Sequence, residues 1–245
     1  MIGIAEKQLL KDGLRLLMFH DINAVSNSQD SDIYKMGVDK FKIVLESLCE
    51  MASTADLPFT TLTGSRTRGI VLTFDDGLRS IADYVFPILA DLHIPFHIFV
   101  STEGVSKTRS SHLSPRLIRD LANSSLVSIG SHGHEHRALT SLDREETRRN
   151  LTTSKNLLEE WTQKEIDSLA YPHGRYSSEV SQISKAVGFR FACTSLPGTF
   201  VDQTDPLAIP RIDIWASDRV IDIKGKLAGT WNRTLRYAYL RSIDE

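Results

Sequence analysis

The segment Gly69-Ile70-Val71-Leu72-Thr73-Phe74-Asp75-Asp76-Gly77 places two adjacent carboxylates directly after a short apolar run. Such a run is typical of a buried β-strand. Neighbouring acids repel each other, so we expect a positive partner beside them or a raised pKa on one of them. A metal ion would meet this need, with one Asp as its ligand and the other left as a base. An Asp-Gly turn with a helix-capping Asp is the alternative.

Apolar runs and amphipathic segments alternate on both sides of this strand. Further strands are predicted at 14–20, 96–100, 127–131, 167–171, 191–194 and 209–214, and helices at 38–51, 80–92, 114–122, 143–161 and 178–187. The alternation predicts parallel strands with crossover helices. Pro87 predicts a kink or break in the second helix. The polar stretch 22–37 is expected to form a loop over the strand ends.

The second polar cluster is Ser131-His132-Gly133-His134-Glu135-His136, which holds three of the eight histidines and follows a predicted strand. Solvated histidines are not normally so clustered, and metal binding is the stronger interpretation. In βα barrels, side chains that follow strands lie at the catalytic end. We therefore expect this cluster to lie near the two aspartates.

Several metal motifs can be compared with the histidine cluster. The zincin motif HExxH requires Glu where Gly133 stands. A metallo-β-lactamase pattern, HxHxDH, would need one more residue before the last His. The amidohydrolase pair HxH fits His132 and His134, but that pair belongs on a first strand. The remaining choice is His132 and His136 with an Asp from elsewhere, a two-His, one-carboxylate face.

Together, Thr73-Phe74-Asp75-Asp76-Gly77 and His132-x-x-x-His136 closely resemble the motifs of the polysaccharide deacetylases, the NodB-homology or carbohydrate esterase 4 family. The resemblance spans roughly residues 14–215 and implies a distorted TIM-like (β/α)7 barrel. It implies that Asp75 is the catalytic base and that Asp76, His132 and His136 bind the metal. Gly133 stands where the family has Ser or Thr, which leaves the hydrogen bonding of that loop open.

The later family motifs are only partly present. In Ala170-Tyr171-Pro172-His173-Gly174, the resemblance implies that the N–H of His173 contributes to an oxyanion hole; an ordinary Pro-Gly turn is the alternative. The arginine that often precedes this proline is absent. Arg211, in the stretch 209–213, is the candidate to replace it by pairing with the base, although a surface salt bridge would explain it equally well.

No histidine follows His173, so the family's last motif, Leu-x-His, is missing. His20, at the end of the first predicted strand, is the candidate general acid, with a buried structural histidine as the alternative. Trp215 and Tyr176 are considered as surfaces on which sugar rings could stack, with the stronger alternative that one of them is simply a core residue.

The function that the resemblance implies is metal-dependent hydrolysis of an N-acetyl or similar acyl group on an amino sugar of a cell-surface polysaccharide or its precursor. Zinc is the expected ion, with cobalt, nickel or manganese as alternatives. Two other classes stay open: an amidase acting on a small non-sugar amide, and a non-catalytic carbohydrate-binding relative. The second would have lost Asp75 or a ligand, whereas all four residues are present.

Composition limits the remaining possibilities. The 245 residues have a formal net charge of −2 and 41% hydrophobic residues, which predicts a globular chain and gives no sign of a nucleic-acid partner. We expect one catalytic domain over 1–245, with a core at about 14–215 and a C-terminal helical segment at 217–245. No signal peptide or transmembrane stretch is recognised, so a cytoplasmic protein acting on a lipopolysaccharide or capsule intermediate is expected, with peripheral membrane association possible.

Overall fold

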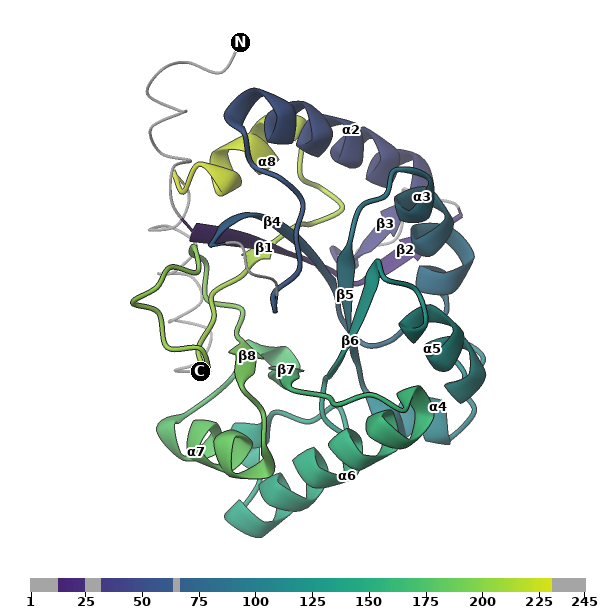
Figure 1. The fold of residues 1–245 in the computed structure, drawn as a ribbon, viewed down its shortest axis with the longest axis vertical. Helices are drawn as coiled ribbons and strands as arrows, with labels where there is room; N and C mark the ends of the chain where they lie inside the picture. Colours follow the sequence, from purple (N-terminus) through teal and green to yellow (C-terminus); the bar gives the residue numbers. More distant parts are fainter. Residues whose placement is uncertain (1–12, 25–31, 64–66, 231–245) are drawn as a thin grey trace.

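The computed structural model describes residues 13–24, 32–63 and 67–230, in which parallel strands form one curved sheet surrounded by helices (Figure 1). The strands of the sheet are β1 (Gly13–Phe19), β4 (Arg68–Phe74), β5 (Phe96–Val100), β6 (Val127–Ser131), β7 (Ser168–Ala170), β8 (Phe191–Cys193) and β9 (Ile212–Asp213). Two short strands, β2 (Asp21–Asn23) and β3 (Lys35–Gly37), form a separate parallel ribbon.

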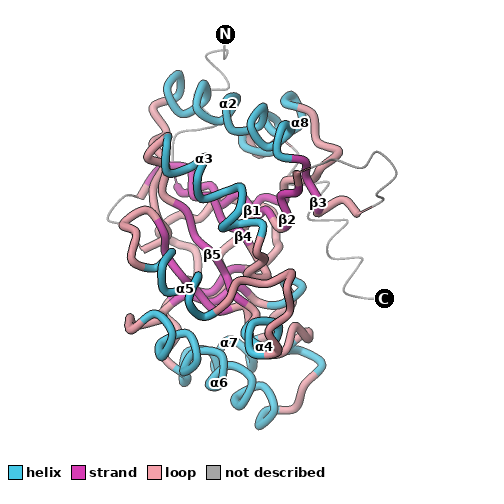
Figure 2. Tube along the Cα trace, turned by 90° about the vertical axis from the view of Figure 1, so that its right-hand side faces the viewer, coloured by secondary structure: helices cyan, strands magenta, loops and turns pink. Residues whose placement is uncertain are grey.

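The helices lie outside the sheet. They are α2 (Val38–Ala55), α3 (Phe86–Asp91), α4 (Thr102–Ser106), α5 (Pro115–Ala122), α6 (Arg144–Thr162), α7 (Ser178–Val187) and α8 (Val220–Leu227). Figure 2 shows the strands between two groups of helices, with α2, α3 and α8 on one side and α5, α6 and α7 on the other. Across the described part of the chain, no helix is both long enough and apolar enough to cross a bilayer.

The order of strands in the sheet is β8-β7-β6-β5-β4-β1-β9, and every neighbouring pair is parallel. The sheet curls toward closure, because a bridge between Cys193 and Ile209 links β8 to the segment just before β9. The predicted distorted (β/α)7 barrel is therefore confirmed. Because all strands run in the same direction, their carboxyl ends meet at one edge of the barrel.

Hydrophobic side chains fill both faces of the sheet. In β1, Leu17 and Phe19 belong to the larger cluster between the sheet and the helices, while Leu14 and Leu16 belong to a smaller cluster with Val71, Phe99 and Ile209. Every residue of β1 is buried. A strand covered on both faces has a nearly continuous apolar sequence rather than an alternating one, as in β1, β4 and β5.

Residues at the ends of the helices explain several boundaries. Asp143 accepts a hydrogen bond from the N–H of Glu146, whose side chain accepts one from the N–H of Asp143, so a capping box begins α6. Ser114 caps α5, and Pro115 occupies its first turn. Gly188 ends α7 in a left-handed conformation with φ 101°.

The structure differs from the sequence-based expectation in a few elements. The helix predicted at 80–92 is a π-helical turn, Ile81–Val85, followed by α3, because Pro87 has no N–H to donate to the preceding turn. The strand predicted at 209–214 is confined to Ile212–Asp213. The stretch predicted as a loop at 22–37 contains most of β2 and all of β3. Its residues 25–31 lie outside the described residues, as does 231–245 of the C-terminal segment.

A buried ion pair connects α8 to the segment that follows β9. Lys226 is 1% exposed; its Nζ lies 2.5 Å from an Asp218 carboxylate oxygen and donates to the carbonyl of Asp213 at 2.9 Å. The same ammonium lies 4.1 Å from the centre of the Trp215 ring. Because both charges are buried, each depends on the other for compensation.

We expect Lys226→Met to lower the free energy of unfolding by about 3–5 kcal/mol, because the carboxylate of Asp218 would stay buried without its cation. Urea denaturation measures the change. Lys224→Met is the matched control: Lys224 lies on the same helix and its Nζ is 3.6 Å from an oxygen of the exposed Glu50. That variant should change stability by no more than about 0.5 kcal/mol. Equal losses in the two variants would contradict this account of the buried pair.

Candidate active site

The predicted site residues follow different strands and meet at the carboxyl edge of the barrel. Asp75 and Asp76 follow β4, His132 follows β6, and His20 follows β1. His173 lies in the 3-10 turn Pro172–Gly174 after β7. With the exception of Arg211, all of them line one pocket of about 450 Å³.

Three of these residues form a group that could hold a metal ion. The Nε2 atoms of His132 and His136 lie 3.6 Å and 3.4 Å from Oδ1 of Asp76. Donor atoms of all three residues lie within 4.8 Å of one another, and the described residues contain no second group of this kind. One carboxylate and two imidazoles form a ligand set typical of zinc and other transition metals.

His132 presents a free lone pair to this group. Its Nδ1 lies 2.7 Å from the carbonyl oxygen of Ala170, which can only accept, so Nδ1 carries the proton and Nε2 is left as the acceptor. Burial lowers the pKa of His132 to about 3, although the charge of Asp75 acts in the opposite direction. The ring is therefore neutral near pH 7, as metal ligation requires.

Asp76 offers the complementary oxygen. Its Oδ1 is buried and has no hydrogen-bond partner among the described residues. Burial raises the pKa of Asp76 to about 6; the charge of His20 lowers it and that of Asp75 raises it. An unpaired buried carboxylate oxygen beside two neutral imidazoles is costly, and a divalent cation would compensate it. The residues present therefore fit a metal ion.

His134 lies outside this group, because its ring is held elsewhere. Its Nδ1 is 2.9 Å from the hydroxyl of Thr102, and the backbone N–H of His134 donates to Asn150 Oδ1 at 2.8 Å. Gly133 takes the left-handed conformation with φ 75°, and a Cβ there would lie 2.9 Å from Asn150 Oδ1. Its N–H donates to Ser131 Oγ, so the loop is hydrogen-bonded without the Ser or Thr that the family places at this position.

Arg211 lies directly against Asp75, not in a surface salt bridge. The two side chains form a bidentate pair at 2.7 Å and 2.8 Å, with both residues 1% exposed. Burial alone raises the pKa of Asp75, but the charge and hydrogen bonds of Arg211 outweigh it and hold the pKa below its ordinary value. Asp75 is therefore a charged, oriented carboxylate at neutral pH.

The other two histidines of the predicted site, His20 and His173, lie on the walls of the pocket. The ring of His173 is centred 4.5 Å from that of His136, and its backbone has φ 59°, a conformation unusual for a residue with a side chain. Burial and the charge of His136 lower the pKa of His173. His20 is packed 4.4 Å from the ring of Tyr34, and its Nδ1 is buried without a partner among the described residues.

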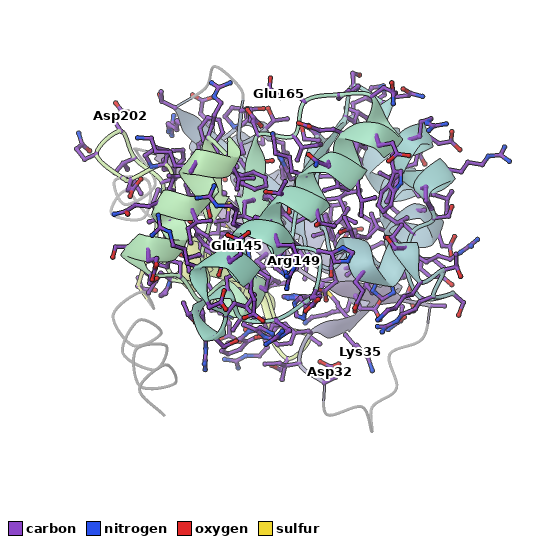
Figure 3. The ribbon with its side chains drawn as sticks, turned by 90° about the horizontal axis from the view of Figure 1, so that it is seen from below. Asp32, Lys35, Glu145, Arg149, Glu165 and Asp202 are labelled. Atoms are coloured by element: carbon purple, nitrogen blue, oxygen red, sulfur yellow. The ribbon has the colours of Figure 1, made fainter. Side chains whose placement is uncertain are left out.

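The remaining pocket wall comes largely from the polar stretch 22–37, which was expected to lie over the strand ends, although no residue of it was predicted to belong to the site. Asp21, Asp32, Tyr34 and Lys35 line the pocket from β2, β3 and the segment before β3. Figure 3 shows Asp32 and Lys35 next to each other at the edge of the molecule, and their ion pair measures 3.6 Å. A short polar stretch has no periodicity that would reveal its position. The one available signal was its length, since long ordered loops are often functional.

Neither aromatic residue considered as a stacking surface lines the pocket. Tyr176 is stacked on Tyr171, with ring centres 5.5 Å apart, and Trp215 packs against the ammonium of Lys226. Both therefore have structural partners, and Tyr176 packs against the hydrophobic core, as the alternative interpretation expected.

Known proteins with similar sequences or similar structures were found for this chain. The chain is 26% identical over 156 residues to the poly-beta-1,6-N-acetyl-D-glucosamine N-deacetylase of Staphylococcus epidermidis, a match covering 59% of this chain and 54% of that protein. It spans about half the length of the curated relatives it matches. A polysaccharide deacetylase from Bacillus cereus superimposes with a TM-score of 0.76 at 22% identity, covering 88% of this chain and 69% of that one.

The deacetylase PplD of Streptococcus pyogenes, solved in complex with acetate, has a TM-score of 0.77 at 18% identity and covers 88% of this chain and 98% of its own. These similarities in structure establish the shared fold. The family model described as polysaccharide deacetylase matches residues 64–192, more than half of the chain. That segment contains the paired aspartates, the histidine cluster and His173, and this chain belongs to the polysaccharide deacetylase family.

Proposed function

We propose that this chain is a metal-dependent deacetylase that removes the N-acetyl group from an amino sugar in a glycan. The observation that carries the proposal is the placement of the buried, Arg211-paired Asp75 directly beside the ligand group Asp76, His132 and His136. One carboxylate is thereby kept as a base while the next serves as a ligand. The Staphylococcus epidermidis relative, named for removing N-acetyl groups from a glucosamine polymer, supports the sugar amide as substrate.

Zinc is the ion we propose, since one carboxylate and two imidazoles suit it, with cobalt, nickel or manganese as possible substitutes. When bound, such an ion would polarise the acetyl carbonyl and make a water molecule more acidic. Asp76, His132 and His136 would hold it.

The protein's own groups would perform the proton transfers. Asp75, kept ionised and oriented by Arg211, accepts a proton from the water that attacks the acetyl carbon. The backbone N–H of His173 donates a hydrogen bond to the oxyanion that forms from the carbonyl oxygen. His20 donates a proton to the sugar nitrogen as the C–N bond breaks, so that acetate and a free amine leave. We propose this as the reaction of a single catalytic domain.

The first test of the function is release of acetate from N-acetylglucosamine oligomers by the zinc-loaded protein. Asp75→Asn should lose activity by about 10²-fold or more while it retains metal, because it removes a general base. Asp76→Asn should instead weaken metal binding itself. Hydrolysis of small amides without any action on sugars would favour the amidase alternative, and equal metal loss in the two variants would show that the carboxylates share ligation.

The second test concerns the ligands. We expect His132→Ala and His136→Ala to lose the metal on dialysis, because each removes one of three protein ligands. His134→Ala is the matched control from the same loop, and it should keep most of its metal, since its ring bonds to Thr102. Metal content, measured by mass spectrometry, distinguishes the ligand variants from the control. Loss of metal from His134→Ala with retention in His136→Ala would support the HxH arrangement instead.

The third test concerns His20. A sugar amine anion is too basic to leave unaided, so we expect His20→Ala to lower kcat far more than it raises KM, with metal content unchanged. The basic limb of the pH–rate profile between about pH 5 and 10 should also change. A variant with nearly normal kcat would show that His20 is structural, and that Asp75 or solvent supplies the proton.

A further inference from the structure

Tyr34 is the one Phe, Tyr or Trp among the described residues that line the pocket. It immediately precedes β3, and it is 39% exposed, so part of its ring is open to solvent while the rest is covered. The covered part packs on His20, with ring centres 4.4 Å apart and the planes inclined by 49°. An aromatic surface is thus available beside the ligand group and the proposed acid.

The backbone around Tyr34 is fixed by hydrogen bonds. Its carbonyl accepts from the N–H of Asp21 at 3.2 Å, and its own N–H donates to a carboxylate oxygen of Asp32 at 3.0 Å. The carbonyl of the preceding residue, Ile33, accepts from the N–H of Ala216 at 2.8 Å. Asp21 is itself held by the hydroxyl of Ser80 at 2.7 Å. The ring is therefore carried on an ordered segment, which reduces the entropy lost when it contacts a ligand.

The hydroxyl of Tyr34 is available for hydrogen bonding. No described residue forms a hydrogen bond with it. Burial, together with the charges of Asp213 and Asp32, raises the pKa of Tyr34 to about 12. The phenol therefore keeps its proton across the working range of an enzyme and can donate as well as accept.

These two properties match a pyranose ring. The face of an aromatic ring carries partial negative charge, and it attracts the slightly positive C–H groups of an apolar sugar face. Tyrosine offers this surface with a polar group at its tip, so one side chain can contact the C–H face and a hydroxyl of the same sugar. Leu78 is an apolar neighbour in the pocket, but it has no such polar group.

We propose that Tyr34 is the sugar-contacting wall of the pocket: its ring packs against the pyranose ring of the N-acetylated sugar, and its hydroxyl forms a hydrogen bond with an oxygen of that sugar. This inference rests on the proposed function and extends it to a residue outside the segment 64–192 that the family model matches. Tyr34 thereby determines which substrates bind, while hydrolysis of the acetyl group depends on other residues.

The test compares two substrates and two variants of the zinc-loaded protein. An N-acetylglucosamine oligomer presents the sugar ring, whereas a small aryl acetate presents only an acetyl group on a good leaving group. Tyr34→Ala should raise KM for the oligomer about tenfold, a loss in the range of aromatic packing plus one hydrogen bond, with kcat within about threefold. Tyr34→Phe, which removes the hydroxyl alone, should raise KM by about threefold. Hydrolysis of the aryl acetate should be unchanged in both.

Ile33→Ala is the matched control. Ile33 is 42% exposed, adjoins Tyr34 and does not line the pocket, and its backbone hydrogen bond survives the substitution. It should leave KM unchanged for both substrates. In the Asp75→Asn background, the oligomer binds without being hydrolysed, so its dissociation constant can be measured by calorimetry. Adding Tyr34→Ala to this background should raise the dissociation constant about tenfold.

Unchanged KM in both Tyr34 variants, together with an unchanged dissociation constant for Tyr34→Ala, would overturn the inference. So would a fall in kcat at constant KM, which would mean that Tyr34 acts through His20, or an equal loss with the aryl acetate, which would mean a purely structural role. If the wild-type protein fails to hydrolyse the oligomer, the proposed function fails. In that case the dissociation constants still test the contact between Tyr34 and the sugar. Weaker binding of the oligomer by Tyr34→Ala supports this contact, whereas an unchanged dissociation constant or no binding at all refutes it.

Discussion

The buried ion pair between Asp75 and Arg211 is the interaction on which the arrangement of the site depends. Both side chains are 1% exposed, so each charge depends on the other for compensation. Arg211 also donates to the carbonyl of Thr194 at 2.9 Å and to the hydroxyl of Thr73 at 3.3 Å. One guanidinium therefore connects the ends of β4 and β8 with the segment before β9, and it fixes the orientation of the carboxylate at the centre.

This pairing separates the properties of two adjacent aspartates. Asp75 gains a guanidinium on both of its oxygens, and its pKa stays below the ordinary value in spite of burial. Asp76 has no such partner, and burial raises its pKa to about 6. The backbones of the two residues also differ: Asp76 has a left-handed conformation with φ 72°, whereas Asp75 does not. Two residues of the same type thus have different charge states and partners within one turn.

The pocket is assembled from parts of the chain that lie far apart in sequence. The ligand group and Asp75 come from the segment matched by the family model, whereas Asp21 and Tyr34 come from before it. Arg211, which pairs with Asp75 behind the pocket lining, comes from after that segment. The buried Lys226, which donates to the carbonyl of Asp213, further ties α8 to β9. Segments on both sides of the matched region therefore contribute to the site.

The sequence by itself predicted the order of most elements and the three residues that the structure brings together as a candidate metal site. Buried parallel strands have apolar runs that can be recognised locally, and polar residues that follow them must lie at one edge of the sheet. It did not determine the π-helical turn at Ile81–Val85, the shortness of β9 or the ribbon formed by β2 and β3, because these depend on pairing and packing with distant segments. The partner of Asp75 could be suggested from its position after a predicted strand, but a surface salt bridge fitted the same pattern. Only the tertiary structure placed Arg211 against Asp75 and Tyr34 beside His20. These contacts span 136 and 14 positions of sequence and leave no local periodic signal, because the first depends on the curling of the sheet and the second on the pairing of β2 with β3.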